Sequence, residues 1–214
     1  MAAADPTLEI ERALLAAGAR TVIGCDEVGR GALAGPVAVG VAVIDATVSA
    51  IPAGLRDSKL LSEPRREALE PLAQAWVLHS AVGLASADEV DELGIIACLG
   101  LAGKRALTIL HEAGVDVTAS VVLLDGNDDW LNKALSTPLN VVTRIKADRD
   151  CGSVAAASVI AKVHRDRLMI EADEQSPGYG WAGNKGYGSA AHMNAIADLG
   201  PHDLHRKSWL KISA

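Results

Sequence analysis

The sequence has few aromatic side chains: four Trp, two Tyr and no Phe among 214 residues. Proteins that hold single-stranded nucleic acid without sequence preference stack successive bases on aromatic rings. Six rings are too few for a surface of that kind. The composition therefore argues against a general single-strand binder.

Cysteine is also scarce. Cys25, Cys98 and Cys151 make an odd number and form no C-x-x-C spacing. A disulfide framework or a zinc site would need pairs or clusters at shorter spacing, so neither is indicated. We expect three buried thiols, and the acids next to Cys25 argue against a thiolate nucleophile there.

Long apolar runs are missing. The longest, Ala32 to Ile44, is too short to span a bilayer and is interrupted by two glycines and a proline. The first residues carry acids and lack the basic start of a secretory signal. We therefore expect a cytoplasmic protein with no membrane association.

Positive charge is in deficit, since the formal net charge is -7. Taken alone, this argues against a nucleic-acid partner. Residues 140–214, however, carry ten basic and eight acidic residues, with four of the six histidines and four of the six aromatics. Such a segment could contact a polyanion, although a solvated surface fits the same counts.

Apolar runs alternate with helical patterns in a chain long enough for one sizeable core. This indicates an α/β protein with one main domain. Strands are predicted at about 21–26, 36–44, 76–84, 120–125 and 139–145, and helices at about 7–18, 62–74, 86–94, 95–113, 151–172 and 189–199.

The first predicted strand ends on two adjacent acids, Asp26 and Glu27, which are followed by Gly29, Arg30 and Gly31. Neighbouring residues of a strand point to opposite faces, so both acids can serve one site only where the strand stops and the backbone turns. The glycines permit such a turn and leave N–H groups uncovered, suited to a phosphate or a sugar. A hairpin with surface charges is the alternative.

Two further acids decide between these interpretations. Asp125 ends the fourth predicted strand and Asp148 follows the fifth. Open α/β sheets place their ligands at the carboxyl ends of strands. Carboxylates from several strands at one edge suit Mg²⁺ or Mn²⁺, and two such ions can activate a water and stabilise a leaving oxygen at a phosphodiester.

The motifs, taken together and in order, closely resemble bacterial ribonuclease HII, a type 2 ribonuclease H, from about residue 21 to 209. Each motif alone would be weak, but six in register are a strong signal. They are Gly24-x-Asp26-Glu27-x-Gly29-Arg30-Gly31, Asp57-Ser58-Lys59, Asp125-Gly126, Lys146-x-Asp148 with Ala155 to Asp166, Lys185-Gly186-Tyr187-Gly188 and His205-Arg206-Lys207-Ser208.

The resemblance implies a ribonuclease H-like mixed five-stranded sheet flanked by helices, with a small C-terminal helical extension. The catalytic domain would be residues 1–175, and the extension, residues 176–214, would belong to the same structural unit and hold the duplex. The implied partners are RNA/DNA hybrids and ribonucleotide-containing duplex DNA. The implied activity is endonucleolytic, with a cut on the 5′ side of a lone ribonucleotide that leaves a 3′-hydroxyl and a 5′-phosphate, as in ribonucleotide excision repair. We expect a monomer.

Residue by residue, the resemblance implies that Asp26, Glu27, Asp125 and Asp148 are the catalytic acids and bind Mn²⁺ or Mg²⁺ in a two-metal mechanism. The turn would read the ribose 2′-hydroxyl, which distinguishes RNA from DNA, and an aromatic would pack on the following sugar. Other side chains would contact phosphates. The implied substrate-binding residues are Gly29, Arg30, Gly31 and Tyr187, with Lys59, Arg165, Lys185 and Ser189 as phosphate contacts.

Other residues allow less specific interpretations. Asp166 could be a fifth catalytic acid, but an acid between two arginines in a helix is more often ion-paired. We expect Asp57 to order its loop and Trp209 to anchor the core. The C-terminal histidines fit helix packing as well as catalysis.

Two rival functions remain. A non-catalytic hybrid binder would gain nothing from four acids that face phosphate. A phosphomonoesterase with the same metal chemistry would not need the basic, aromatic C-terminal arm.

Overall fold

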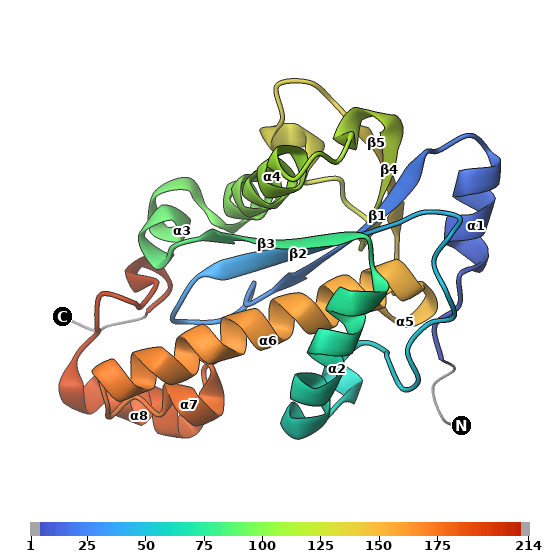
Figure 1. The fold of residues 1–214 in the computed structure, drawn as a ribbon. Coiled ribbons are helices and arrows are strands. Elements are labelled where there is room, and N and C mark those ends of the chain that lie inside the picture. Colours follow the sequence, from blue (N-terminus) through green and yellow to red (C-terminus); the bar gives the residue numbers. More distant parts are fainter. Residues whose placement is uncertain (1–4, 211–214) are drawn as a thin grey trace.

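A five-stranded mixed sheet forms the centre of the protein, which we describe from a computed structural model over residues 5–210 (Figure 1). The predicted domain boundaries include residues 1–4 and 211–214, which lie outside the described part. The strand order is β3-β2-β1-β4-β5; β1 pairs antiparallel with β2, which pairs antiparallel with β3, and β4 runs parallel to β1 and β5. The strands are β1 (Thr21–Val28), β2 (Val37–Ile44), β3 (His79–Ala85), β4 (Ser120–Asp125) and β5 (Asn140–Arg144). The predicted mixed sheet is confirmed.

Helices cover both faces of this sheet. On one face α4 packs on β2 and β3, and on the other the long helix α6 packs on β1 and β2 and carries α2 on its outer side (Figure 1). Two buried apolar clusters fill the spaces between these layers. The helices are α1 (Glu9–Ala16), α2 (Glu63–Trp76), α3 (Ala87–Leu93), α4 (Ile95–Glu112), α5 (Ala147–Asp150), α6 (Gly152–Gln175), α7 (Trp181–Asn184) and α8 (Ala190–Leu199).

Two predicted strand boundaries are wrong. Strand β1 continues past Asp26 to Val28, because β2 keeps pairing with it to the register Val28↔Ala38. Helix α2 runs through Trp76, which was predicted to open a strand, and β3 starts only at His79. The predicted end of β1 at Asp26 does match the place where its parallel partner is lost, since the β1–β4 pairing ends at Cys25↔Leu124.

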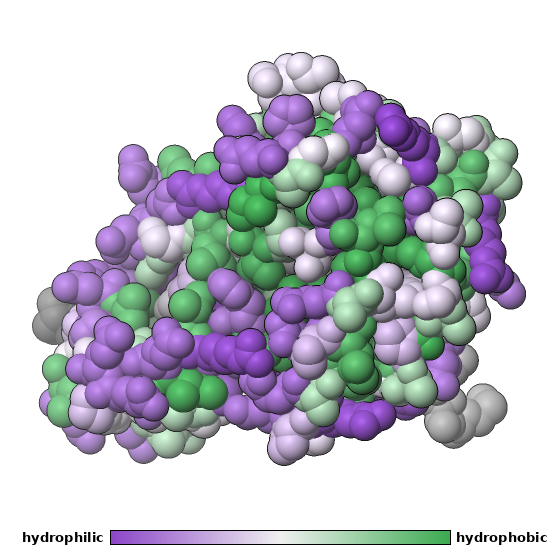
Figure 2. All heavy atoms as spheres, in the orientation of Figure 1, coloured by the Kyte–Doolittle hydropathy of each residue, from purple (hydrophilic) through white to green (hydrophobic). Residues whose placement is uncertain are grey.

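The segment after α6 folds back onto that helix. Tyr179, Trp181 and Ile196 form a third apolar cluster with Met169 of α6 and Ala34 from the loop after β1. In the view of Figure 2, hydrophilic residues gather on the surface where the C-terminal helices α7 and α8 lie. Among residues 5–210, no helix combines the length and hydropathy that a membrane span requires.

Helix α6 lies unusually close to the sheet because glycines face it. A Cβ on Gly24 of β1 would come within 2.3 Å of the Ser153 backbone, and one on Gly40 of β2 within 2.5 Å of the Ala157 carbonyl oxygen. Real Cβ atoms do not approach backbone this closely. The alanine-rich first half of α6 meets these two glycines.

Gly24→Ala should therefore lower the free energy of unfolding by about 1–3 kcal/mol or more, the usual cost of overpacking a core. The matched control is Gly183→Ala in α7, where a new Cβ would meet no atom within 4 Å. Its unfolding free energy should change by no more than about 0.5 kcal/mol. Urea denaturation of both variants measures the difference, and equal stabilities would show that α6 can move away from β1 without cost.

Candidate active site

Acidic side chains come together where β1 and β4 end. The parallel register Cys25↔Leu124, continued by one residue, sets Asp26 beside Asp125. Neighbouring strands are about 4.8 Å apart, so these two carboxylates share one edge of the sheet. Because β4 stops at Asp125, only the last residues of β1, Glu27 and Val28, extend past it.

Asp148 reaches the same edge from helix α5. Lys146 precedes this helix in the left-handed conformation, with a φ of 63°, which is uncommon for a residue other than glycine. The turn aims the Ala147 N–H at Asp125, whose Oδ1 accepts it at 2.7 Å. Lys146, in this uncommon conformation, thus orients the Asp125 carboxylate and positions Asp148.

Asp26 is almost fully buried, with 3 % of its surface exposed. Burial raises the pKa of its carboxyl well above the ordinary value, and the charges of Glu27 and Asp125 add to that rise, while a hydrogen bond from Ser158 of α6 opposes it. Glu27 is partly buried, and its Oε1 accepts from Arg30 Nη1 at 3.3 Å. The two neighbours leave β1 in different directions, yet their charges still act on each other.

Asp125 and Asp148 are coupled as well. Burial raises the pKa of Asp125 first, and the Asp148 charge raises it further. Burial also raises the pKa of Asp148. Burial and neighbouring charges therefore raise the pKa values of three acids from three elements, Asp26 of β1, Asp125 of β4 and Asp148 of α5.

Lys59 is the cation that faces these acids. Its Nζ lies 3.2 Å from Asp148 Oδ2. Partial burial opposes its charge, but the carboxylates of Asp26 and Asp148 outweigh burial and raise its pKa. Asp57 accepts the Lys59 N–H at 2.9 Å and caps the short turn from Ser58 to Leu60, which confirms that Asp57 orders its loop.

The donor set suits a hard divalent cation. Within residues 5–210, no three His, Cys, Asp or Glu side chains are grouped so as to enclose an ion on their own. Mg²⁺ uses one or two carboxylates and completes its shell with waters or substrate phosphates, so a closed protein cage is not required. Clustered carboxylates with raised pKa values are the oxygen donors that such an ion would stabilise.

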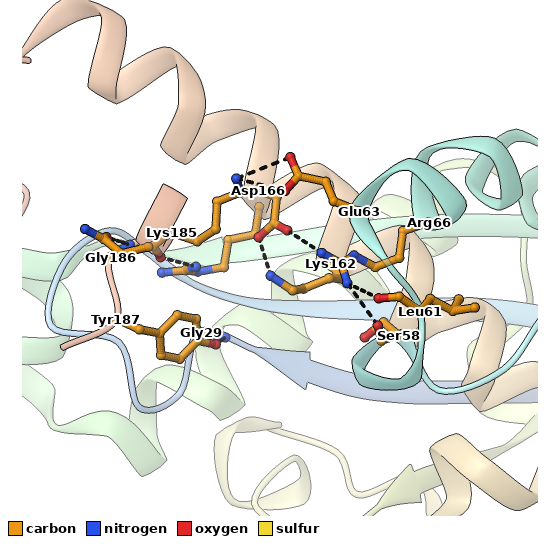
Figure 3. Close-up of polar contacts among 12 residues, drawn as sticks. Gly29, Ser58, Leu61, Glu63, Arg66, Lys162, Asp166, Lys185, Gly186 and Tyr187 are labelled. Carbon is orange, nitrogen blue, oxygen red and sulfur yellow. Dashed lines mark hydrogen bonds and ion pairs between the residues drawn. The ribbon is translucent and has the colours of Figure 1, made fainter. Parts of the chain in front are cut away.

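The turn after β1 lies beside the acids. Gly29 has a φ of 80°, and a Cβ there would lie 2.1 Å from Arg165 Nε, so only glycine fits. Gly31 has no atom within 4 Å of a Cβ position, which leaves its backbone open to a ligand. The Gly29 N–H donates to the phenol oxygen of Tyr187 at 3.2 Å, so the tyrosine lies against the turn (Figure 3).

A hollow lies beside the turn and the predicted tyrosine. Its lining includes Glu27, the one of the four acids that reaches it, together with Lys59, Tyr187 and Lys162 of α6. Sequence reasoning did not single out Lys162. The only signal was its place four residues before Asp166, to which its Nζ donates.

Arg165, predicted to contact a phosphate, is held by backbone carbonyl oxygens in this structure. The side chain is fully buried, and its guanidinium donates to the carbonyl oxygens of Pro36 at 2.8 Å, Lys185 at 2.9 Å and Ala34 at 3.0 Å. All three nitrogens of the guanidinium thus donate to backbone carbonyl oxygens beneath the turn. Its basic sequence context gave no sign of burial.

Lys185, also predicted to contact a phosphate, is likewise bound by groups of the protein. Only 5 % of its surface is exposed, and its Nζ lies 3.3 Å from Glu63 Oε2 and also donates to the Ala182 carbonyl (Figure 3). Lys59 and Ser189 are exposed and stay predicted phosphate contacts. The Ser189 Oγ caps α8 by accepting the His192 N–H at 3.2 Å.

Arg206 supports the turn from the other side, and sequence reasoning missed it. It is fully buried, and it donates to the carbonyl oxygens of Gly29 at 2.7 Å and Arg30 at 2.9 Å. Its motif was visible, but an arginine in the most basic window of the chain could not be told from a surface residue.

The prediction that Asp166 is ion-paired is confirmed, and the open question about the C-terminal histidines is narrowed for two of them. Asp166 is buried and ion-paired with Lys162 and Arg66 (Figure 3). The C-terminal histidines His192 and His205 are fully buried packing groups.

Comparisons with known proteins match this arrangement over nearly the whole chain. The family model described as Ribonuclease HII matches residues 23–212. Ribonuclease HII of Streptomyces griseus subsp. griseus is 47% identical, covering 98% of this chain and 86% of that protein. The ribonuclease H2 structure from Pyrococcus horikoshii OT3 is similar with a TM-score of 0.69 at 27% identity, covering 88% of this chain and 93% of that one. Bst-RNase HIII in complex with Mn²⁺ gives a TM-score of 0.66 at 25% identity, covering 86% and 64%.

Removing one charge from the acidic edge should stabilise the metal-free protein. At neutral pH, Asp125→Asn should raise the melting temperature by roughly 2–4 °C, the shift that about 1 kcal/mol gives in a domain of this length. The amide still accepts the Ala147 N–H but no longer carries the charge that burial and Asp148 disfavour. The control is Asp198→Asn on the exposed side of α8, which should leave the melting temperature unchanged.

The rise in melting temperature expected for Asp125→Asn should depend on pH. Since the pKa of Asp125 is raised above its ordinary 3.8, its stabilising contribution is fully present below that value and is lost as the pH rises through the folded pKa. The variant's advantage should therefore shrink in acid. Thermal denaturation in a chelator at several pH values measures this, and equal melting temperatures for wild type and Asp125→Asn at neutral pH would contradict it.

Proposed function

Because the chain belongs to the ribonuclease HII family and is thus a ribonuclease H, an endonuclease on the RNA of RNA/DNA hybrids, we propose that it also cuts duplex DNA at a single embedded ribonucleotide. The cut would fall on the 5′ side of the ribonucleotide and leave a 3′-hydroxyl and a 5′-phosphate, as ribonucleotide excision repair requires. The observation that carries this proposal is that the turn follows the acidic edge directly along the chain: Gly29 comes only two residues after Glu27. A group that reads the sugar is therefore tied to the groups that act on the adjacent phosphate.

The acids would hold the metal. Asp26, Glu27, Asp125 and Asp148 are the proposed ligands of two Mg²⁺ or Mn²⁺ ions, which would supply an activated water and stabilise the leaving oxygen. Lys59, now beside Asp148, would be released to a substrate phosphate when cations neutralise the carboxylates. No covalent intermediate on the protein is needed, which fits three buried cysteines.

The turn and the tyrosine would read the sugars. Gly31 leaves open space next to its backbone, where a ribose can approach, and Arg30 is exposed beside it. Tyr187 is 38% exposed and its hydroxyl lies against Gly29, so the ring can pack on the sugar that follows the ribonucleotide. A missing 2′-hydroxyl at that sugar would let the ring approach more closely, which makes the junction the preferred site.

The C-terminal extension, residues 176–214, would grip the duplex as part of the same structural unit as the catalytic domain, residues 1–175. Ser189 is exposed at the start of α8, next to Tyr187, where it can contact a phosphate beyond the junction. We further propose that the protein acts as a monomer in the cytoplasm.

Cleavage tests the catalytic assignment. Wild-type protein with Mg²⁺ or Mn²⁺ should cut a labelled DNA duplex that contains one ribonucleotide, and Asp125→Asn should lower the cleavage rate by about 10²–10³-fold or more, since a charge that acts on the reacting centre is lost. Duplex binding should persist. The control Asp128→Asn changes an exposed acid paired with Lys133 and should cleave normally. Unchanged cleavage by Asp125→Asn would remove Asp125 from the site.

Junction preference tests the tyrosine. Tyr187→Ala should lower the preference for a single ribonucleotide over a continuous hybrid by about tenfold, because one ring–sugar contact of about 1–2 kcal/mol is lost. Tyr187→Phe keeps the ring and loses only the acceptor of the Gly29 N–H, so it should retain most of the preference. Rates on both substrates give the ratio, and an unaltered ratio in Tyr187→Ala would refute this role.

A further inference from the structure

Three buried side chains beneath Tyr187 have no part in the chemistry above. Trp181, His192 and His205 are all fully buried within the C-terminal extension. Trp181 Nε1 lies 3.1 Å from His192 Nε2, and the two histidine Nε2 atoms are also 3.1 Å apart. Polar groups held this deeply need defined partners.

The partners of His192 fix where its proton lies. The indole N–H of Trp181 can only donate, so His192 Nε2 must accept. The Tyr187 carbonyl oxygen can only accept, and His192 Nδ1 lies 2.9 Å from it, so Nδ1 carries the proton. His205 packs against this pair, and its Nδ1 faces both the His202 N–H at 2.8 Å and the His202 carbonyl oxygen at 3.3 Å. The two contacts of His192 therefore hold it in a single tautomer, with the Nδ1 proton directed at Tyr187.

This tautomer holds one end of Tyr187. The Tyr187 carbonyl oxygen accepts from His192 Nδ1 and from the Ser189 N–H at 2.8 Å, while the phenol oxygen at the other end accepts the Gly29 N–H. The Arg165 guanidinium lies 5.6 Å from the ring centre. Tyr187 is thus fixed at its backbone by the extension and at its tip by the turn.

We propose that His192 is a positioning residue for Tyr187, and that the Trp181–His192–His205 network makes the C-terminal extension a determinant of junction specificity. This rests on the function proposed above for Tyr187. By binding the backbone carbonyl of Tyr187, the network sets the position of the tyrosine ring relative to the turn. Loss of the Nδ1 donor would let the backbone at Tyr187 shift while the acidic edge stays intact.

Two substitutions at His192 separate the effect of the Nδ1 donor from the effect of the ring's volume. In His192→Asn the new side-chain amide can be placed where Nδ1 donates, whereas the longer side chain of His192→Gln places its amide near the Nε2 position. His192→Gln should therefore lower the single-ribonucleotide preference by about tenfold and leave kcat/KM on a continuous hybrid within a few-fold, and His192→Asn should restore most of the preference. An unaltered preference in His192→Gln would overturn the proposal.

The matched control is Tyr179→Phe. Tyr179 stacks on Trp181 with ring centres 4.8 Å apart, and its hydroxyl donates to the Gly200 carbonyl at 2.9 Å, away from Tyr187. It should lose stability comparable to one buried hydrogen bond, about 1 kcal/mol, and keep its preference. If Tyr179→Phe lost preference as His192→Gln does, general loosening of the extension would explain both, and the proposal would fail.

A second readout does not depend on cleavage. The Gly29 amide is protected by the Tyr187 phenol, so its hydrogen exchange reports the position of the tyrosine. Exchange at Gly29 should be about tenfold faster in His192→Gln and unchanged in Tyr179→Phe. If His192→Gln does not fold, Trp181→Phe, which removes the donor to Nε2 and also makes the buried ring smaller, should show the same faster exchange.

The two readouts distinguish failure of this proposal from failure of the proposed function. A wild-type enzyme without junction preference would contradict the function proposed for Tyr187, yet Gly29 exchange would still decide whether His192 positions it. Unchanged Gly29 exchange in folded His192→Gln or Trp181→Phe would overturn the positioning role.

Discussion

The close contact of helix α6 with strands β1 and β2 is the constraint on which the rest of the site depends. Gly24 and Gly40 remove the side chains that would otherwise keep the helix away. At that distance α6 places Ser158 against Asp26 and Arg165 beneath the turn. One face of a single helix therefore serves the acids and the recognition turn together, because residues three or four apart lie on the same side of a helix.

This arrangement gathers charges that disfavour one another. Burial and neighbouring carboxylates raise the pKa values of three of the four acids, and Lys59 is the cation that faces them. On the other side, Arg165 and Arg206 are buried against backbone carbonyls, and neither forms an ion pair with an acid within the described residues. The fold thus pairs an acidic edge, suited to divalent cations, with a turn supported by positive charge, suited to a nucleic-acid backbone. A protein of net charge -7 can accommodate a polyanion because these charges are local.

Much of this could be predicted from the sequence, since the signals were local. An apolar run that ends on an acid marks a strand end, so Asp125 could be placed without the structure. Burial of charged side chains could not be predicted, because it depends on segments far apart in the chain. Arg165 and Lys185 are basic residues of the kind that contact phosphate, but Arg165 is bound by the loop after β1 and Lys185 by Glu63 at the start of α2. The true end of β1 depended on pairing with β2, which continues after β4 has stopped.

The central claim is that sugar recognition and phosphodiester cleavage are coupled at one short segment, from Asp26 to Gly31. The most direct measurement is to map the cut in a DNA duplex with one ribonucleotide, with Mg²⁺ or Mn²⁺, beside the same duplex with deoxyribose or a 2′-O-methyl ribose at that position. The account predicts a single cut on the 5′ side of the ribonucleotide with a 3′-hydroxyl end, and no cut in either of the other duplexes. Cleavage at another position, equal cleavage of the all-DNA duplex, or no cleavage by folded protein with either cation would contradict it.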